Sequence, residues 1–139
     1  MPTSREKLLD EVLKWETHPA FCRSKVTLTN SSGAAFAKGA SLLGQVALFT
    51  SATAATIRAA ATDVGATDDL GIVIKKERLT AELADSGTLA NVLMLRNGPA
   101  LVHDNEIVYP TDKTDTVAAL AAKGIRTVDE TGEAYSSLV

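Results

Sequence analysis

The sequence predicts a mainly β domain of the α+β class, with one helix near each end. Three observations predict it. Between residues 25 and 110, short apolar runs with the two-residue period of strands are separated by turns rich in Gly, Asn, Asp and Ser. Residues 70–79 form the densest run of β-branched side chains. Helical spacing of apolar residues is found only near the two ends, over 3–15 and 111–124.

At the N-terminus we expect an amphipathic helix over residues 3–15. Thr3 and Glu6 have the spacing of a capping box. One face carries apolar side chains at helical spacing: Leu8, Leu9, Val12 and Leu13, with Trp15 at its edge. Pro19 then ends any helix, because the residue before a proline is pushed toward extended geometry. The chain is therefore divided into a helix with an extended arm, residues 1–24, and one β-rich domain, residues 25–139.

The β-rich domain contains a series of short predicted strands. They are expected near residues 25–29, 42–49, 55–60, 70–79 and 105–110, with a pair over 88–102 that is separated by Asn97-Gly98-Pro99, and a last strand over 125–130. The second helix precedes this last strand. Thr111 is its expected cap, Val117, Leu120 and Ala121 its inner face, and Gly124 its C-terminal stop.

The composition is that of one folded domain. The chain has 139 residues, of which 45% are hydrophobic and 22% charged, so it can bury a core. Its net charge of −3 gives no reason to expect nucleic acid, since phosphate-binding domains carry a basic surplus. No apolar run reaches the roughly 20 residues of a membrane span, and the N-terminus lacks a signal-peptide core. We therefore expect synthesis in a cytoplasm and no membrane partner.

A reactive thiol is the first chemical possibility. The only cysteine, Cys22, follows His18 by four residues, and Arg23 is next to it. Pro19 excludes a helix that would place His18 and Cys22 on one face, and in a strand residues four apart stand roughly 13 Å from each other. A catalytic thiolate needs a base or cation in contact with it. We therefore interpret Cys22 as a structural residue at the start of a strand.

Metal and nucleotide sites are not predicted either. His18, Cys22 and His103 are too scattered for a zinc site, and Asp63, Asp68 and Asp69 lack the pattern of a calcium loop. Residues 39–44, GASLLG, match neither GxGxxG nor a P-loop. His103 is interpreted as a strand-end residue, and Lys38 as part of a plain turn. The expectation is a protein without cofactor and without catalytic activity.

The order of several short motifs resembles a known family. "HPAFCRSKVTL" is followed by "AFAKGASLLGQV", "LMLRNGPALV" and a closing "AALAAKGIRTVDE". This order is similar to that of phage head decoration (capsid cement) proteins, the family of the phage lambda head decoration protein. The resemblance covers roughly residues 18–129. Its matching positions are His18, Pro19, Phe21 and Arg23 in the arm, Lys38, Gly39 and Gly44 in the turn, Arg96, Gly98, Pro99 and Ala100 in the strand pair, and Ala119 to Ile125 at the end.

The resemblance implies a compact β-barrel or β-tulip-like decoration domain with residues 1–24 as its docking arm. It implies a virion protein on the outer surface of the expanded capsid. The implied partners are the phage major capsid protein and further copies of the chain itself, as a homotrimer. The candidate capsid or trimer contacts are Leu8, Val12, Trp15, Pro19, Phe21 and Arg23. Two alternatives stay open: Trp15 and Phe21 could pack on their own domain, and the chain could be a non-catalytic β-barrel module that binds a small ligand or a host protein.

Overall fold

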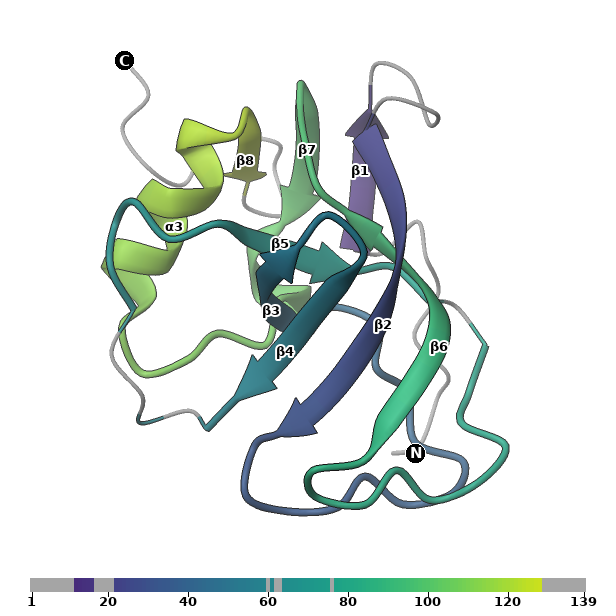
Figure 1. Cartoon of the computed structure of the whole chain (residues 1–139). Helices are drawn as coiled ribbons and strands as arrows, with labels where there is room; N and C mark the ends of the chain where they lie inside the picture. The colour runs from purple at the N-terminus through teal and green to yellow at the C-terminus, as the bar shows by residue number, and fades with distance from the viewer. Residues whose placement is uncertain (1–11, 17–21, 60, 62–63, 76, 129–139) are drawn as a thin grey trace, which may run out of the picture.

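The computed structural model describes residues 12–16, 22–59, 61, 64–75 and 77–128. Within them the chain forms strands, one 3-10 helix and one α-helix, labelled as in Figure 1. In chain order these are β1 (Leu13–Glu16), β2 (Arg23–Ser31), β3 (Val46–Ser51), β4 (Ala54–Arg58), β5 (Leu70–Val73), β6 (Thr88–Leu95), β7 (Ala100–His103), η1 (Asp104–Glu106), α3 (Lys113–Ala122) and β8 (Ile125–Val128).

Five of these strands close into a barrel. Their order is β2-β4-β3-β5-β6, and the barrel closes because β6 pairs with β2. The β2–β4 pair is parallel and the other pairs are antiparallel. On β2, Val26, Leu28 and Asn30 are buried while Lys25 and Thr27 are exposed, so the two-residue period of this sequence directly gives an inside and an outside.

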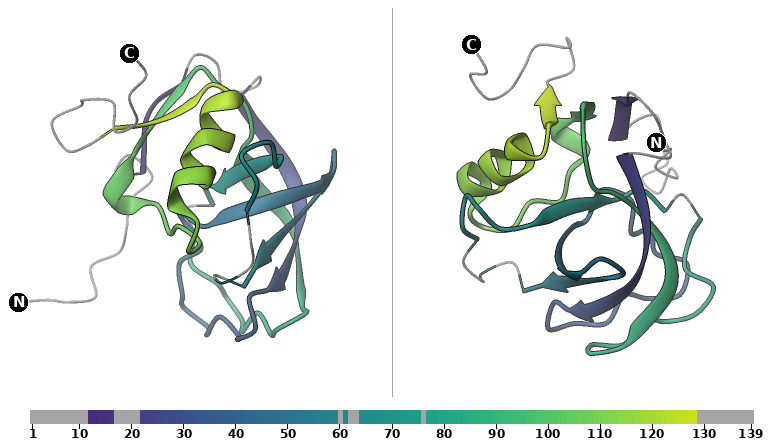
Figure 2. Two further views of the ribbon diagram at one scale, coloured as in Figure 1. Left: turned by 90° about the vertical axis from the view of Figure 1, so that its left-hand side faces the viewer. Right: turned by 45° about the horizontal axis from the view of Figure 1, so that its top comes forward.

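The remaining strands form a second sheet of three, in the order β1-β7-β8. β7 and β8 are parallel, and α3 makes the crossover between them. Figure 2 shows α3 beside this sheet, at one side of the barrel. The helix buries one face and ends at Gly124, whose φ of +84° is the left-handed conformation that suits a glycine after a helix.

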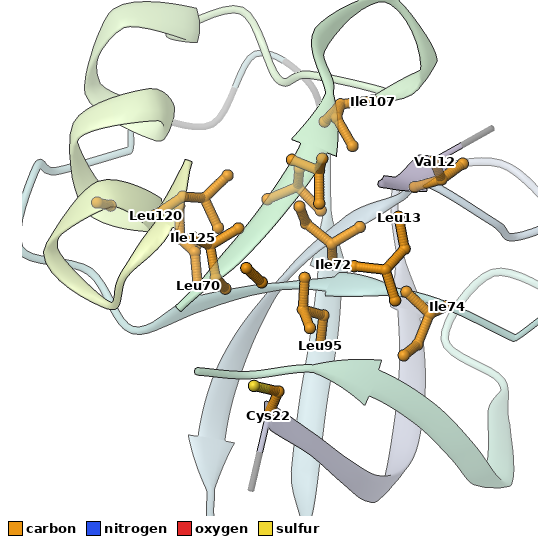
Figure 3. Packing of buried hydrophobic residues seen from close by; sticks show 14 of the residues in the cluster. Val12, Leu13, Cys22, Leu70, Ile72, Ile74, Leu95, Ile107, Leu120 and Ile125 are labelled. Atoms are coloured by element: carbon orange, nitrogen blue, oxygen red, sulfur yellow. The ribbon is translucent and has the colours of Figure 1, made fainter. Parts of the chain in front are cut away.

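The hydrophobic core has two parts. One fills the barrel, with Leu28, Val73 and Met94 among its members. The other lies between the barrel and the three-stranded sheet and contains residues of β1, β5, β6, α3 and β8. Figure 3 shows side chains of this core from close by, with labels on Val12, Leu13, Cys22, Leu70, Ile72, Ile74, Leu95, Ile107, Leu120 and Ile125. This second core makes the barrel and the sheet one packed unit.

The sequence analysis predicted the fold class correctly at the coarser level. The chain is mainly β, with a closed barrel and one helix near its C-terminal end, where residues 113–122 are helical. The expected strands near 25–29, 55–60, 88–102 and 125–130 are found as β2, β4, the β6–β7 pair and β8. Asp112 rather than Thr111 is the N-cap of α3.

The predicted N-terminal helix is not supported. Residues 13–16 form β1, which pairs antiparallel with β7, and residues 3–11 lie outside the described residues. Leu13-Lys14-Trp15-Glu16 also alternates apolar and polar residues, so its pattern fits a strand as well as a helix end. Pairing with the edge of β7 satisfies the backbone groups of β1, and this long-range contact outweighs local helix propensity.

Three predicted strands differ in extent. β3 begins at Val46 rather than near 42, because Gly44 with φ +91° turns the chain first. β5 ends at Val73; buried Ile74 still donates to the carbonyl oxygen of Leu93 on β6, at 3.0 Å, and charged residues follow it in the sequence. Residues 105–110 contain the end of η1 and a single bridge between Val108 and Gln45 instead of a strand. In the described part of the chain, no helix is long and apolar enough to cross a membrane.

Candidate interaction site

Arg23 is held inside the chain by an ion pair. Its Nε donates to both carboxylate oxygens of Glu16, at 2.9 and 3.1 Å, and its Nη2 donates to Oε1 at 2.5 Å. The Glu16 side chain is only 9% exposed, and that of Arg23 is 24% exposed. A bidentate arginine–carboxylate pair is geometrically specific, so this contact fixes the end of β1 to the start of β2.

The other predicted contact residues differ in where they lie and in whether the structure describes them. Val12 is fully buried and Leu13 nearly so, in the core between barrel and sheet. Trp15 lies on β1 opposite Leu101, and its side chain is not among those described. Leu8, Pro19 and Phe21 lie outside the described residues. Contact of these residues with a capsid or with another copy stays a prediction, but the Val12 side chain is already buried in the core of its own domain.

Cys22 is a buried residue at the entry of β2. Its side chain has no exposed surface, and Sγ lies 3.8 Å from the carbonyl oxygen of Pro99. Its own carbonyl oxygen accepts from the backbone N–H groups of Arg96, at 2.7 Å, and Asn97, at 3.1 Å. His18 lies outside the described residues. Cys22 therefore connects the arm to the loop between β6 and β7, as a packing residue does.

The other residues considered as catalytic or metal-binding candidates have local structural surroundings that the structure describes. Nδ1 of His103 accepts from the backbone N–H of Asn105, at 3.2 Å, and so caps η1. Asp68 lies 3.5 Å from the Arg58 guanidinium. Among the described residues no three His, Cys, Asp or Glu side chains are grouped as metal ligands. Lys38 is exposed on a turn in which Gly39 has φ +86°.

A polar cluster joins the barrel to the three-stranded sheet. Asp69, just before β5, is ion-paired with Arg96 after β6 and with Lys123 after α3. Both cations also lie over the ring of Phe49 on β3, at 4.3 and 5.0 Å from its centroid. Cation–π contacts of this kind add to the ion pairs. The sequence analysis considered Asp69 only as a possible calcium ligand and missed this junction.

Two glycines make the closest backbone contact of this junction. Gly98 donates to the carbonyl oxygen of Lys123 at 2.8 Å, and Ala100 donates to that of Gly124 at 3.1 Å. A Cβ atom on Gly98 would lie only 1.9 Å from the carbonyl oxygen of Gly124. The Gly98–Pro99 peptide bond is cis. The "NGPA" and "AAKGI" motifs, which are 26 positions apart, are therefore one structural unit.

The described surface also contains an apolar groove of about 300 Å³. Val108, which is 45% exposed, is the most exposed large hydrophobic residue among those described. The segment that carries it is held by Asp104, which is buried and accepts from the Tyr109 hydroxyl at 2.6 Å and from Lys113 Nζ at 3.2 Å. The groove is lined by Ser32, Ala34, Phe36, Gln45, Val46, Ile57, Arg58, Val108, Tyr109 and Pro110.

The sequence analysis did not find this groove. It assigned residues 105–110 to a strand, which would have placed Val108 in a sheet. The apolar run from Ile107 to Pro110 has no local signal that tells an exposed position from one covered in a sheet, so the sequence pattern could not show the groove.

Comparison with protein-family models, with curated proteins and with solved structures finds no match to this chain.

Proposed function

We propose that this protein is a structural, non-catalytic component of a phage head. In this proposal it binds the outer surface of the expanded capsid, as a homotrimer at three-fold positions, and stabilises the capsid against the pressure of the packaged DNA. Its partners are the phage major capsid protein and further copies of itself. Binding only the expanded lattice would stabilise that state by mass action.

One observation supports the proposal more than any other. The motifs that carry the resemblance are spread over about 110 positions, but in the structure three of them meet. Cys22 of the arm accepts from Arg96 and Asn97 of the strand pair, and Gly98 packs on Gly124 at the end of the closing helix. Short motifs that match by chance need not meet in this way. The arm is thus attached, at Cys22, directly to the loop between β6 and β7, which packs on the end of the closing helix.

The arm would act from a fixed starting point. Val12 and Leu13 are buried and Glu16 is held by Arg23, so the segment before residue 12 is tethered to a rigid body. Eleven residues span at most about 36–40 Å when fully extended. An extended segment can bind by adding a strand to an exposed sheet edge, where main-chain hydrogen bonds demand little of the sequence. Three such arms on one trimer would raise the avidity well above that of a single arm.

Co-sedimentation with capsids tests the proposal. Expanded and unexpanded capsids of the source phage, both stripped of this protein, are incubated with the purified chain. We expect saturable binding to the expanded form alone, near one trimer per three-fold position. The deletion to use is 1–11 rather than a longer one, because removing residues 12–23 would also remove buried Val12, Leu13 and Cys22.

The matched control for this deletion replaces residues 1–11 with an equally long Gly/Ser segment. Loss of binding in both variants, with unchanged thermal unfolding, would show that the sequence of residues 1–11 is required. Equal affinity of the deleted chain and the full chain would show that residues 1–11, the first part of the arm, take no part in the mechanism. If the full chain bound neither capsid form, the decoration proposal would be wrong.

The second candidate function is that of a non-catalytic β-barrel binding module, and the apolar groove favours it. Exposed Val108 beside half-buried Phe36 offers a site for an apolar ligand group. The dye 8-anilinonaphthalene-1-sulfonate is a suitable probe. Saturable binding that Val108→Ser weakens, while Ala81→Ser at an exposed site elsewhere does not, would support this function. A chain that does not bind the dye saturably would contradict it.

A further inference from the structure

Two groups of cations can be distinguished among the described residues. The first group is ion-paired with carboxylates of the same chain: Arg23, Arg58, Arg96, Lys113 and Lys123. In the second group, Lys25, Lys38, Lys75 and Arg126 form no ion pair with any carboxylate in the described part of the chain. Cations without a carboxylate partner keep their charge available to another molecule.

Two loops bring Lys38 of the second group close to a further cation, Arg78. The backbone N–H of Gly39 donates to the carbonyl oxygen of Leu79 at 2.8 Å, and that of Leu79 donates to Ala40 at 2.9 Å. Arg78 Nη1 donates to the carbonyl oxygen of Gly39 at 3.2 Å, which places Arg78 close to Lys38. Figure 1 shows the two loops side by side at the end of the barrel away from α3.

Lys75 is a further cation of the second group at these two loops. Its Nζ donates to the carbonyl oxygen of Glu77, at 2.6 Å, so the ammonium lies over the loop that carries Arg78. We call Lys38, Lys75 and Arg78 the basic ridge. Lys38 and Arg78 are exposed, and Lys75 is half-buried. Glu77 is the one acidic residue between Lys75 and Arg78 in the sequence, so the ridge keeps a local positive surplus.

The charge of the whole chain indicates what kind of partner fits this ridge. The net charge is −3, so a long polyanion such as DNA would meet repulsion from the rest of the molecule. An acidic patch on a folded protein would face the ridge alone. No aromatic residue occurs over 37–40 or 74–79 that could stack on a base. Both facts favour a protein partner.

We propose that the basic ridge binds an acidic surface of a folded protein partner. Under the proposed function, on which this assignment rests, the partner surface is the capsid lattice, and the ridge is a second contact besides the arm. Charges at such a contact act mainly on the association rate and its salt dependence. The ridge would therefore orient the barrel during encounter, before the arm engages.

Charge reversal on the ridge is the test. Lys38→Glu has a matched control in Arg126→Glu, since both residues are exposed, neither has an ion pair among the described residues, and both changes alter the net charge by −2. We expect Lys38→Glu to weaken binding to expanded capsids roughly tenfold, with a flatter dependence on salt. Arg126→Glu should stay within about twofold of the unmodified chain, and Lys38→Arg should bind normally.

The outcomes separate the two proposals. If the unmodified chain binds the capsids and ridge reversal weakens it no more than Arg126→Glu does, the ridge assignment is wrong and the decoration proposal stands. If the unmodified chain does not bind the capsids, the decoration proposal fails, and a second measurement on the unmodified chain decides on the ridge.

That measurement is an NMR titration with poly-L-glutamate and, separately, with a DNA duplex of equal total charge. We expect amide shift changes from poly-L-glutamate concentrated over residues 37–40 and 74–79, and weaker changes from the duplex. Shifts concentrated elsewhere, or stronger binding of the duplex, would overturn the assignment. Unfolding by urea checks that each ridge variant is folded.

Discussion

Replacing Gly98 with alanine tests the packing of the junction most directly. The new Cβ would lie 1.9 Å from the carbonyl oxygen of Gly124 and 2.3 Å from its carbonyl carbon. Carbon–oxygen contacts normally begin near 3.3 Å, so the two backbone segments would have to separate by about 1.4 Å. The atoms that clash belong to the backbone, and no side-chain rotation can relieve them.

The cost follows from the contacts that this separation would break. Gly98 N donates to Lys123 and Ala100 N donates to Gly124, and each such hydrogen bond contributes about 0.5–1.5 kcal/mol. Forcing a methyl group into a packed site adds about 1–3 kcal/mol. We therefore expect Gly98→Ala to lower the free energy of unfolding by about 2–6 kcal/mol, a large share of the total for a domain of this size.

Urea unfolding, followed by circular dichroism and by the fluorescence of the single tryptophan, Trp15, measures this change. Gly65→Ala is the matched control, because a Cβ there would make only an ordinary contact, 3.5 Å from Asp68 Oδ1. The control should stay within about 1 kcal/mol of the unmodified protein. A Gly98→Ala variant as stable as Gly65→Ala would refute the argument that the two motifs are locked together.

Three further predictions concern buried polar groups. Asn30 is fully buried and its Nδ2 donates to three carbonyl oxygens, so Asn30→Ala should lower the free energy of unfolding in urea by about 2–4 kcal/mol. The control Asn105→Ala, at an exposed position, should lower it by less than about 0.5 kcal/mol, and equal losses would contradict the prediction. Glu16→Gln should lower stability by about 1–3 kcal/mol, because it removes the carboxylate that holds Arg23; an unchanged urea midpoint would show that this pair does not anchor β1. Cys22 should react with Ellman's reagent about 100-fold or more slowly in the native protein than in the denatured one, and equally fast labelling would contradict its burial.

The sequence by itself determined the class of the fold and most of its elements. The alternation on β2 and the two strands on either side of Asn97-Gly98-Pro99 are local patterns, and local patterns can be read without knowing the partner strands. The helix over 113–122 and its end before Gly124 were predicted for the same reason. The apolar periodicity of each of these segments fits only one type of secondary structure, and tertiary contacts did not change that type.

At β1 the tertiary structure made the choice. Leu13 and Trp15 fit a helix end and a strand equally well, and the free edge of β7 decided for the strand. Residues 105–110 differ from the prediction for a related reason, since the bond from Tyr109 to buried Asp104 shapes a loop. Neither contact is visible in the local pattern.

Only the tertiary structure brought distant residues together. Glu16 with Arg23, Asp69 with Lys123, and Gly98 with Gly124 are contacts that no periodicity indicates, and so is the meeting of the loops that form the basic ridge. Periodicity reports which face of an element is buried, but not which element covers it. In this chain the order of the barrel strands and the position of the helix decide that, and they thereby determine which charges are paired inside the protein and which remain available to a partner.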